Sequence, residues 1–292
     1  MSWVILGTAP YEDFPLVEGV CSVQNGRLIL GEHSVKIARG TPALITTACI
    51  SAQVLGISAP KAMLVGDIGD GKGSEKLYAR VWEQIGSQSM SLLTFHYLQP
   101  DLNWCLKINM KLEELAQRPT LVADAGYMYV AKMSGQANLY DLFTPDIGEM
   151  AFLADENAPH PFYTRGFLLQ DESSAPDLIK RAYEHQNAAK FLLVKGRKDY
   201  VASQEGILDV ISEPVVENME PIGGTGDSLT GIVSSLIASG IQIPKAASMA
   251  AKANRYLGLL ANPTPAHSIS DLMAYLPDAL EKTLKEYDYL CF

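Results

Sequence analysis

The chain has 292 residues, of which 48% are hydrophobic and 19% charged, a balance typical of a globular protein with a sizeable core. Its net charge of −10, without a basic cluster, argues against nucleic acid as a main partner but leaves room for small phosphate ligands. No apolar run approaches the roughly 18 residues of a membrane span, and the N-terminus has no signal-peptide pattern, so we expect no membrane association.

The four cysteines, Cys21, Cys49, Cys105 and Cys291, are far apart in the sequence and form no C-x-x-C motif. This spacing gives no sign of a zinc or redox site and predicts a reduced, cytoplasmic protein. Cys49 and Cys105 lie in apolar helical contexts, so we expect them in the core.

The first sixty residues are irregular. Residues 3–6 resemble a short strand, and Asn25-Gly26 between apolar flanks predicts a hairpin over 21–30. Thr41 and Pro42 are typical of an N-cap and a first helical residue, which predicts a helix to about Leu55 that is apolar nearly all round.

A Gly-rich loop follows the next strand, which we place at residues 61–65. The loop, 66–74, precedes an amphipathic helix over 75–85, a layout typical of ligand-binding turns in parallel sheets. It falls short of a phosphate-binding P-loop, because Gly73 occupies the position where Ser or Thr would hold Mg²⁺. We therefore expect either a tight structural turn or a loop that binds a hydroxylated or carboxamide ligand. The candidate substrate contacts in the loop are Asp67, Gly69, Asp70 and Gly71.

Strands and helices alternate through the middle of the chain. We expect strands at 90–95, 119–124 and 191–196, and helices at 101–116 and 177–188. Asp124 ends one of these strands, where open α/β sheets place ligands, although it is equally suited to cap the next helix. Thr144 and Asp146 are cap-like before a helix, and Glu149 fits a capping box.

The later part of the chain also has recognisable signals. Lys195 ends its strand and is either structural or a ligand contact, and 199–202 is expected to pair with 206–210. Helices are predicted at 245–260 and from 268 toward 284, the last broken at Pro277.

The most informative stretch is Ile222 to Gly231, with three glycines and one carboxylate before an apolar helix that ends near Gly240. A Gly-rich turn into a helix exposes backbone N–H groups that bind anions, here at Gly223, Gly224, Thr225 and Gly226. Asp227, in the first helical turn, is either favourable helix capping or a base that removes a proton beside the anion.

From residue 61 onward this order predicts an α/β fold with a mostly parallel central sheet and helices on both faces. We expect a single domain over 1–292, with 1–60 as an atypical N-terminal elaboration. The apolar helices near 42–55 and 245–260 suggest a possible homo-oligomer.

Several stretches, in the right order, resemble the NAD(P)H-hydrate dehydratases, a branch of the ribokinase-like superfamily. Residues 223–232 (GGTGDSLTGI) resemble the family's G-G-T-G-D-x-L-x-G-I motif, and 142–153 resemble its L-T-P-H-P-G-E-M-A-x-L segment. Smaller matches are 121–126, 193–196 and 268–277. The sequence departs from the family at Asp146-Ile147, where the family has His-Pro, at Asn254-Arg255, where it has His-Gly, and in the loop 66–74.

The resemblance implies a ribokinase-like three-layer α/β/α sandwich and a nucleotide-dependent enzyme. ATP or ADP would donate a phosphoryl group with Mg²⁺, Asp227 would accept the proton of the acceptor hydroxyl, and 223–226 would hold the phosphoryl group. Lys195 and Asn254 are then candidate nucleotide contacts, Asp124, Asp146 and Glu149 candidate substrate contacts, and Glu149 a candidate Mg²⁺ contact.

Three functions follow from these expectations. The first is repair of hydrated NAD(P)H, in which the hydroxyl is phosphorylated and phosphate is eliminated. The second is a kinase for a sugar, a vitamin precursor or another small hydroxylated molecule, and the third is a non-catalytic nucleotide-binding relative. An intact Asp227 disfavours the third, because a binding protein needs no base.

Overall fold

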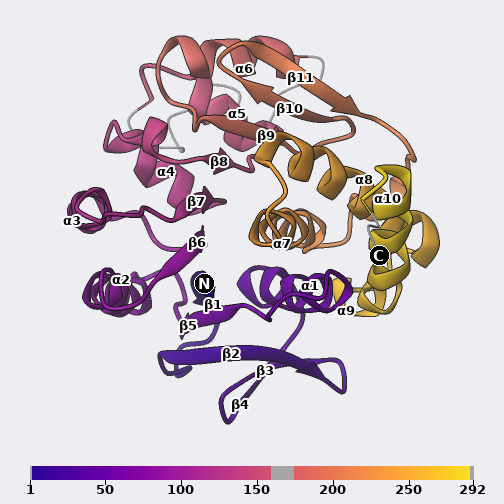
Figure 1. The fold of residues 1–292 in the computed structure, drawn as a ribbon, viewed down its shortest axis with the longest axis horizontal. Helices are drawn as coiled ribbons and strands as arrows, with labels where there is room; N and C mark the ends of the chain where they lie inside the picture. Colours follow the sequence, from indigo (N-terminus) through magenta and orange to yellow (C-terminus); the bar gives the residue numbers. More distant parts are fainter. Residues whose placement is uncertain (1, 159–173, 290–292) are drawn as a thin grey trace. The chain divides into compact units, whose positions relative to one another are not determined.

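The computed structural model describes residues 2–158 and 174–289 (Figure 1). The chain divides into two compact units. Unit 1 comprises Met1–Leu16 with Leu64–Val210, and unit 2 comprises Val17–Met63 with Ile211–Phe292. The expectation of one domain over the whole chain stays a prediction, and each unit is described by itself.

Unit 1 is built on a mostly parallel sheet, in which β9-β8-β7-β6-β1 are successive neighbours. These strands are β1 (Ser2–Ala9), β6 (Met90–His96), β7 (Thr120–Ala123), β8 (Leu142–Phe143) and β9 (Phe191–Val194). The antiparallel β10 (Asp199–Ser203) and β11 (Gly206–Ile211) extend it beyond β9, and β5 (Lys61–Gly66) lies next to β1. The predicted α/β fold with a mostly parallel sheet is confirmed.

The pairing register of this sheet explains where its core and its functional edge lie. A single row of paired residues crosses the five parallel strands, and all of its members are fully buried: Leu6, Phe95, Ala123, Phe143 and Leu192. Because the strands are parallel and in register, their carboxyl ends lie on this row or within three residues beyond it. The polar residues at the end of β6 and directly after β7 and β9 are therefore brought to one edge.

Helices α2 (Lys72–Gln84), α3 (Leu102–Glu113), α4 (Gly126–Met133), α5 (Ile147–Ala154) and α6 (Ala175–Glu184) complete unit 1. Phe95 of β6 stacks on Tyr127 of α4, with ring centroids 4.1 Å apart, and Tyr140 packs edge-on against both rings. This aromatic cluster holds α4 against the sheet at the position where the chain leaves β7. Cys105 is buried beside it, as expected for a core cysteine.

Unit 2 has a small antiparallel sheet and a group of packed helices. The strands are β2 (Val17–Gln24), β3 (Arg27–Leu30) and β4 (His33–Lys36). The predicted hairpin is confirmed, since Asn25 and Gly26 both adopt positive φ in the turn between β2 and β3. The helices are α1 (Thr41–Val54), α7 (Thr225–Ala238), α8 (Ile243–Ala261), α9 (Ile269–Leu272) and α10 (Leu276–Glu286).

Helices α1 and α7 approach each other closely, and Gly231 makes this possible. A Cβ atom on Gly231 would lie 2.5 Å from the carbonyl oxygen of Leu44, closer than any real contact. Side chains of α1 are buried along nearly its whole length, including Cys49, as the all-round apolar sequence predicts. Since α1 is covered within its own chain, it gives no support to a homo-oligomer, which stays a prediction.

Three details of the sequence-based elements are corrected by the structure. Gly40, with φ 72°, is the N-cap of α1 in place of Thr41, and Pro42 falls within the first turn. Helix α2 begins at Lys72, three residues before the predicted start, and α8 begins at Ile243, ahead of Lys245. In each case a loop residue in an unusual conformation or a proline starts the helix earlier than the apolar periodicity indicates.

The capped start at Ser268 is confirmed, with Asp271 completing a capping box, and Pro277 lies in the first turn of a separate helix, α10. Residues 159–173 and Cys291 lie outside the described residues. Within residues 2–158 and 174–289, no helix is long and apolar enough to cross a membrane.

Candidate active site

The Gly-rich stretch forms the entrance to α7 in unit 2, as predicted. Gly224 is the N-cap and adopts a left-handed conformation with φ 105°. Because it has no side chain, it leaves the N–H groups of the first turn without a capping oxygen of its own. Thr225 stabilises the turn through its hydroxyl, which donates to the carbonyl of Ile222 at 3.2 Å. The backbone donors and the helix dipole together form a candidate anion site.

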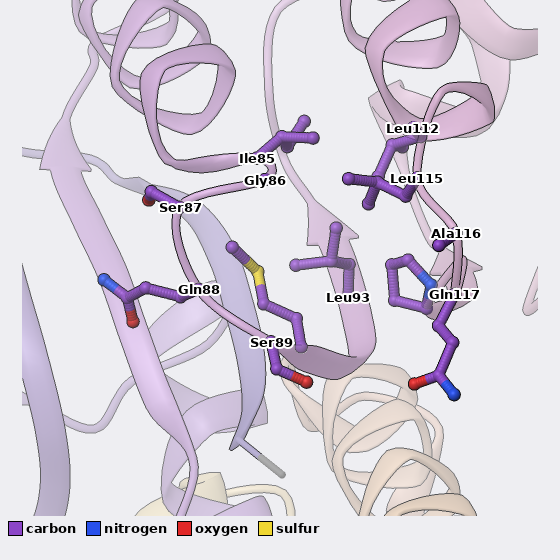
Figure 2. A pocket seen from close by; sticks show the side chains of 12 residues that line it. Ile85, Gly86, Ser87, Gln88, Ser89, Leu93, Leu112, Leu115, Ala116 and Gln117 are labelled. Carbon is purple, nitrogen blue, oxygen red and sulfur yellow. The ribbon is translucent and has the colours of Figure 1, made fainter.

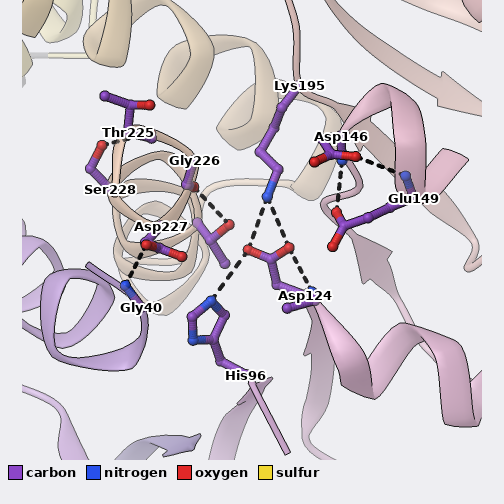
Figure 3. Close-up of polar contacts among 12 residues, drawn as sticks. Gly40, His96, Asp124, Asp146, Glu149, Lys195, Thr225, Gly226, Asp227 and Ser228 are labelled. Atoms are coloured by element: carbon purple, nitrogen blue, oxygen red, sulfur yellow. Dashed lines mark hydrogen bonds and ion pairs between the residues drawn. The ribbon is translucent and has the colours of Figure 1, made fainter. Parts of the chain in front are cut away.

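Asp227 lies in the first turn of α7 and is held in one orientation by the start of α1 (Figure 3). Its Oδ2 accepts a hydrogen bond of 2.6 Å from the backbone N–H of Gly40. The carboxylate is 9% exposed, so it is largely screened from solvent. A short, charge-assisted hydrogen bond to a fixed backbone group limits its rotation, which suits a group that must accept a proton at a defined point.

The first turn of α7 is supported from α8 by Asn254. Its side-chain Nδ2 donates to the carbonyl of Thr225 at 3.1 Å, and its Oδ1 accepts from the hydroxyl of Ser228 at 2.6 Å. Both ends of the amide are therefore engaged with α7. These contacts assign Asn254 a structural role at the anion site, and its expected nucleotide contact stays a prediction.

In unit 1, Asp124 forms a buried ionic cluster at the carboxyl edge of the sheet (Figure 3). Its oxygens lie 2.9 and 3.1 Å from Nζ of Lys195, and His96 Nε2 lies 3.8 Å from its Oδ2. Asp124 also accepts from the N–H of Ala125 at 2.8 Å, and it is 1% exposed. It thus faces the interior, and the three side chains come from the ends of three parallel strands.

Lys195 is charged in this cluster. Burial alone would lower the pKa of its ammonium group, but the carboxylates of Asp124 and Glu149 outweigh that effect and raise it above its ordinary value. Lys195 therefore provides a permanent positive charge at the sheet edge. Sequence reasoning missed His96, although a polar residue ending an apolar strand is the same signal that pointed to Asp124.

Glu149 closes the capping box that its spacing predicts. Its Oε2 accepts from the N–H of Asp146 at 2.8 Å, Asp146 accepts from the N–H of Glu149 at 2.7 Å, and Tyr129 donates to Oε1 at 3.3 Å. Burial raises the pKa of Glu149 to about 8, although the charge of Lys195 opposes this shift. The helix-capping role is confirmed for Asp146 and Glu149, and their contacts with substrate or Mg²⁺ stay predictions.

The loop after β5 is organised by Asp67. Its carboxylate accepts hydrogen bonds from the N–H groups of Gly69, Gly71 and Ser74 at 2.8, 3.2 and 2.8 Å, and from the Ser74 hydroxyl at 2.7 Å. Burial would raise its pKa, but these bonds outweigh burial and hold the pKa of Asp67 below its usual value. Asp70 pairs instead with Lys72 at the surface, at 2.6 Å. The turn is thus tightly structured, and the ligand contacts expected of these residues stay predictions.

A cavity of about 430 Å³ opens elsewhere in unit 1, between the α2–β6 and α3–β7 connections (Figure 2). Leu93, Leu112, Leu115 and Pro119 contribute to its lining. It lies toward the amino ends of β6 and β7, and none of the predicted site residues lines it. This cavity is therefore distinct from the candidate site.

Among residues 2–158 and 174–289, no group of three or more His, Cys, Asp or Glu side chains is arranged to hold a metal ion. Nucleotide-bound Mg²⁺ does not need such a cage, since phosphates and waters supply most of its ligands alongside one or two carboxylates. The half-buried carboxyl group of Glu149 fits that limited requirement.

The sequence also matches a known family. Residues 103–284 match the family model described as NAD(P)H-hydrate dehydratase, which is more than half of the chain. The chain belongs to the NAD(P)H-hydrate dehydratase family. This is a family of enzymes, and the match includes the segment of Glu149, the strand ending in Lys195 and the entrance to α7.

Two relatives and one solved structure extend this result. An uncharacterized protein from Methanocaldococcus jannaschii is 42% identical over 226 residues, which is 77% of this chain and 93% of the relative. The bifunctional NAD(P)H-hydrate repair enzyme of Hyperthermus butylicus is 33% identical over 118 residues, 39% of this chain, and the match covers 21% of that enzyme.

The solved structure is a ribokinase-like superfamily protein from Enterococcus faecalis, with a TM-score of 0.55 and 14% identity over 97% of this chain and 87% of the other. The predicted ribokinase-like fold is thus confirmed for this member of the dehydratase family. Because 97% of the chain is covered, the fold match includes most of residues 1–60, which lie outside the segments that resemble the family.

Proposed function

We propose that this chain is a nucleotide-dependent NAD(P)H-hydrate dehydratase that uses Asp227 as its catalytic base. The observation that carries the proposal is the geometry at the entrance to α7. A carboxylate in the first turn of a helix is a poor neighbour for a phosphate, yet here it is buried and fixed by the N–H of Gly40 beside a glycine-built anion site. A fixed carboxylate beside an anion site is the arrangement that suits removal of a proton from a hydroxyl next to a phosphoryl group.

The reaction has two stages. The hydroxyl oxygen on the hydrated nicotinamide ring attacks the terminal phosphorus of ATP or ADP, its proton passes to Asp227, and the shortened nucleotide leaves. In the resulting ester, phosphate is a better leaving group than the original hydroxyl. Phosphate then departs with the C–O bonding electrons while the adjoining carbon loses a proton, and the double bond of the reduced nicotinamide is restored.

The chain's own groups support the first stage in distinct ways. The backbone N–H groups at Gly224, Thr225 and Gly226 bind the phosphoryl oxygens and need no rearrangement as negative charge develops. Asn254 keeps this turn in place through its bonds to Thr225 and Ser228. Lys195, in unit 1, stays a proposed nucleotide contact because it carries a positive charge in a chain whose net charge is −10.

Mg²⁺ would be held by the nucleotide phosphates and Glu149, directly or through water, and it neutralises phosphate charge when bound. Glu149 must be ionised to serve in this way. Its raised pKa therefore predicts that Mg²⁺ binding displaces a proton at neutral pH. The cytoplasmic location and a homo-oligomeric state remain predictions that the proposed reaction does not require.

The test uses hydrated NADH with ATP or ADP and follows the return of absorbance of the reduced nicotinamide. Wild-type protein is expected to restore the absorbance with one of the two nucleotides, and Asp227→Asn to reduce the rate by about 10²- to 10⁴-fold. Asp278→Asn is a matched control, because Asp278 is an exposed carboxylate in the first turn of α10, in the same unit, and has no role in the proposed chemistry. Restoration at the wild-type rate by Asp227→Asn would contradict the assignment of the base.

A second candidate is a small-molecule kinase, which would use the same base and anion site but release its phosphorylated product. It is favoured by the acceptor segment, where Asp146 caps α5 in the position at which the dehydratases have histidine. Nucleotide consumption with a hydroxylated acceptor, without recovery of NADH absorbance, would support this kinase over the dehydratase.

A further inference from the structure

Arg39 lies against the loop that precedes the anion site. A Cβ atom placed on Gly223 would be 3.4 Å from Cδ of Arg39 and 3.8 Å from its Cβ, an ordinary van der Waals contact. The aliphatic part of the arginine therefore passes over Gly223, the residue directly before the left-handed Gly224. Both residues belong to unit 2, so this neighbourhood is formed within one compact body.

The guanidinium group of Arg39 is exposed and stands out among the arginines of unit 2. Arg255 donates to the carbonyls of Ser212 and Pro214, and Arg27 donates to Ser34. Arg39 forms no comparable hydrogen bond or ion pair with any residue in the described ranges 2–158 and 174–289. Arg39 lies beside the candidate anion site in a chain of net charge −10. Because no carboxylate of the described residues pairs with it, the five N–H donors of its guanidinium group are available to a ligand.

The backbone next to Arg39 is fixed to the catalytic carboxylate. Gly40 turns the chain with φ 72° and gives its N–H to Oδ2 of Asp227 at 2.6 Å. Arg39 is therefore anchored on one side by this hydrogen bond and on the other by its contact with Gly223. The two contacts limit where the guanidinium can reach, and the N–H groups that enter α7 lie within the same corner of unit 2.

We propose that Arg39 binds the phosphoryl oxygens of the nucleotide at the entrance to α7 and neutralises charge as the phosphoryl group is transferred. The ligand class is a nucleoside di- or triphosphate. The assignment of the transfer step rests on the proposed function, whereas phosphate binding by Arg39 does not. The guanidinium group of Arg39 would contribute positive charge and bidentate hydrogen bonding.

The experiment compares Arg39→Ala and Arg39→Lys with the control Arg27→Ala, which removes the same charge from an exposed position on β3. Binding of ADP, of a non-hydrolysable ATP analogue and of inorganic tripolyphosphate is measured by calorimetry at low and high salt, and turnover of hydrated NADH is measured separately. Arg39→Ala is expected to weaken phosphate binding and lower kcat/KM by about 10- to 100-fold. The phosphate affinity and kcat/KM of Arg39→Lys should lie between those of Arg39→Ala and the wild type, because lysine keeps the positive charge but lacks the planar guanidinium group that forms two parallel hydrogen bonds. Arg27→Ala should match the wild type in both measurements.

The outcomes separate the two proposals. If the wild type binds tripolyphosphate and Arg39→Ala does not, while neither repairs hydrated NADH, the role of Arg39 stands and the dehydratase function fails. In the opposite outcome, the wild type repairs hydrated NADH, while Arg39→Ala binds the polyphosphates with the wild-type affinity and salt dependence and turns over with the wild-type kcat. This result overturns the role of Arg39, and the dehydratase function stands. A wild type that neither binds polyphosphates nor turns over overturns both. Thermal unfolding of each variant confirms that it is folded, as expected for an exposed side chain.

Discussion

Replacing Gly224 by alanine tests whether the geometry of the anion site depends on this one residue. The φ of 105° is unfavourable for any residue with a Cβ atom and costs about 1–3 kcal/mol. The new Cβ would also lie 2.9 Å from Cγ2 and 3.0 Å from Cβ of Ile269, and relieving such an overlap costs about another 1–3 kcal/mol. We therefore expect Gly224→Ala to lower the free energy of unfolding by about 2–6 kcal/mol, a large part of the about 5–15 kcal/mol typical of a folded domain.

Gly223→Ala is the matched control, since Gly223 has no positive φ and its Cβ would meet only the flexible side chain of Arg39. Urea unfolding should show little change for this variant, within about 1 kcal/mol. The double variant Gly224→Ala/Ile269→Ala should be less destabilised than the two single changes added together, because the shorter side chain relieves part of the overlap. Equal stability of Gly224→Ala and Gly223→Ala would refute the reasoning.

Two further predictions concern unit 1. A carboxyl group whose pKa is raised from 4.5 to about 8 on folding holds its proton more tightly in the folded chain, so Glu149 should make the protein less stable as pH rises through this range. Glu149→Gln, which keeps the helix cap, should remove that loss in urea unfolding at a series of pH values, and an unchanged pH dependence would contradict it. Asp67→Asn should lower the unfolding free energy by about 1–3 kcal/mol, because an amide leaves loop donors unsatisfied, whereas Asp70→Asn, at the surface, should change it by less than about 0.5 kcal/mol. Equal melting temperatures for the last two variants would show that Asp67 does not organise the loop.

The sequence was sufficient to predict the parts of this protein that depend on local patterns. The periodicity of strands and helices from residue 61 predicts the parallel sheet, and Gly224, Asp227 and the capping box at Asp146 are identified from short motifs. These features rely on backbone conformations and spacings that a few neighbouring residues determine. The family assignment from those motifs is confirmed by the match over residues 103–284.

Contacts between distant residues were not predictable in the same way. No local pattern connects Gly40 with Asp227, yet the N–H of Gly40 orients Asp227, which lies 187 positions further along the chain. His96 reaches Asp124 only because β6 and β7 are adjacent and parallel. The prediction of Thr41 as the N-cap is wrong, because the chain turns one residue earlier at Gly40, whose φ of 72° suits a residue without a side chain.

The hydrogen bond between Gly40 and Asp227 has a consequence for how the protein can be shortened or recombined. The stretch that matches the dehydratase family begins at residue 103, so it contains Asp227, the proposed base, but not Gly40, whose N–H orients it. A fragment of residues 103–284 would keep the motif that contains Asp227 but would lose Gly40, the hydrogen-bond partner of the Asp227 side chain. The segment around Gly40 is therefore needed to orient the proposed base, and a graft of this segment onto another family member requires a backbone N–H at the position that Gly40 occupies here.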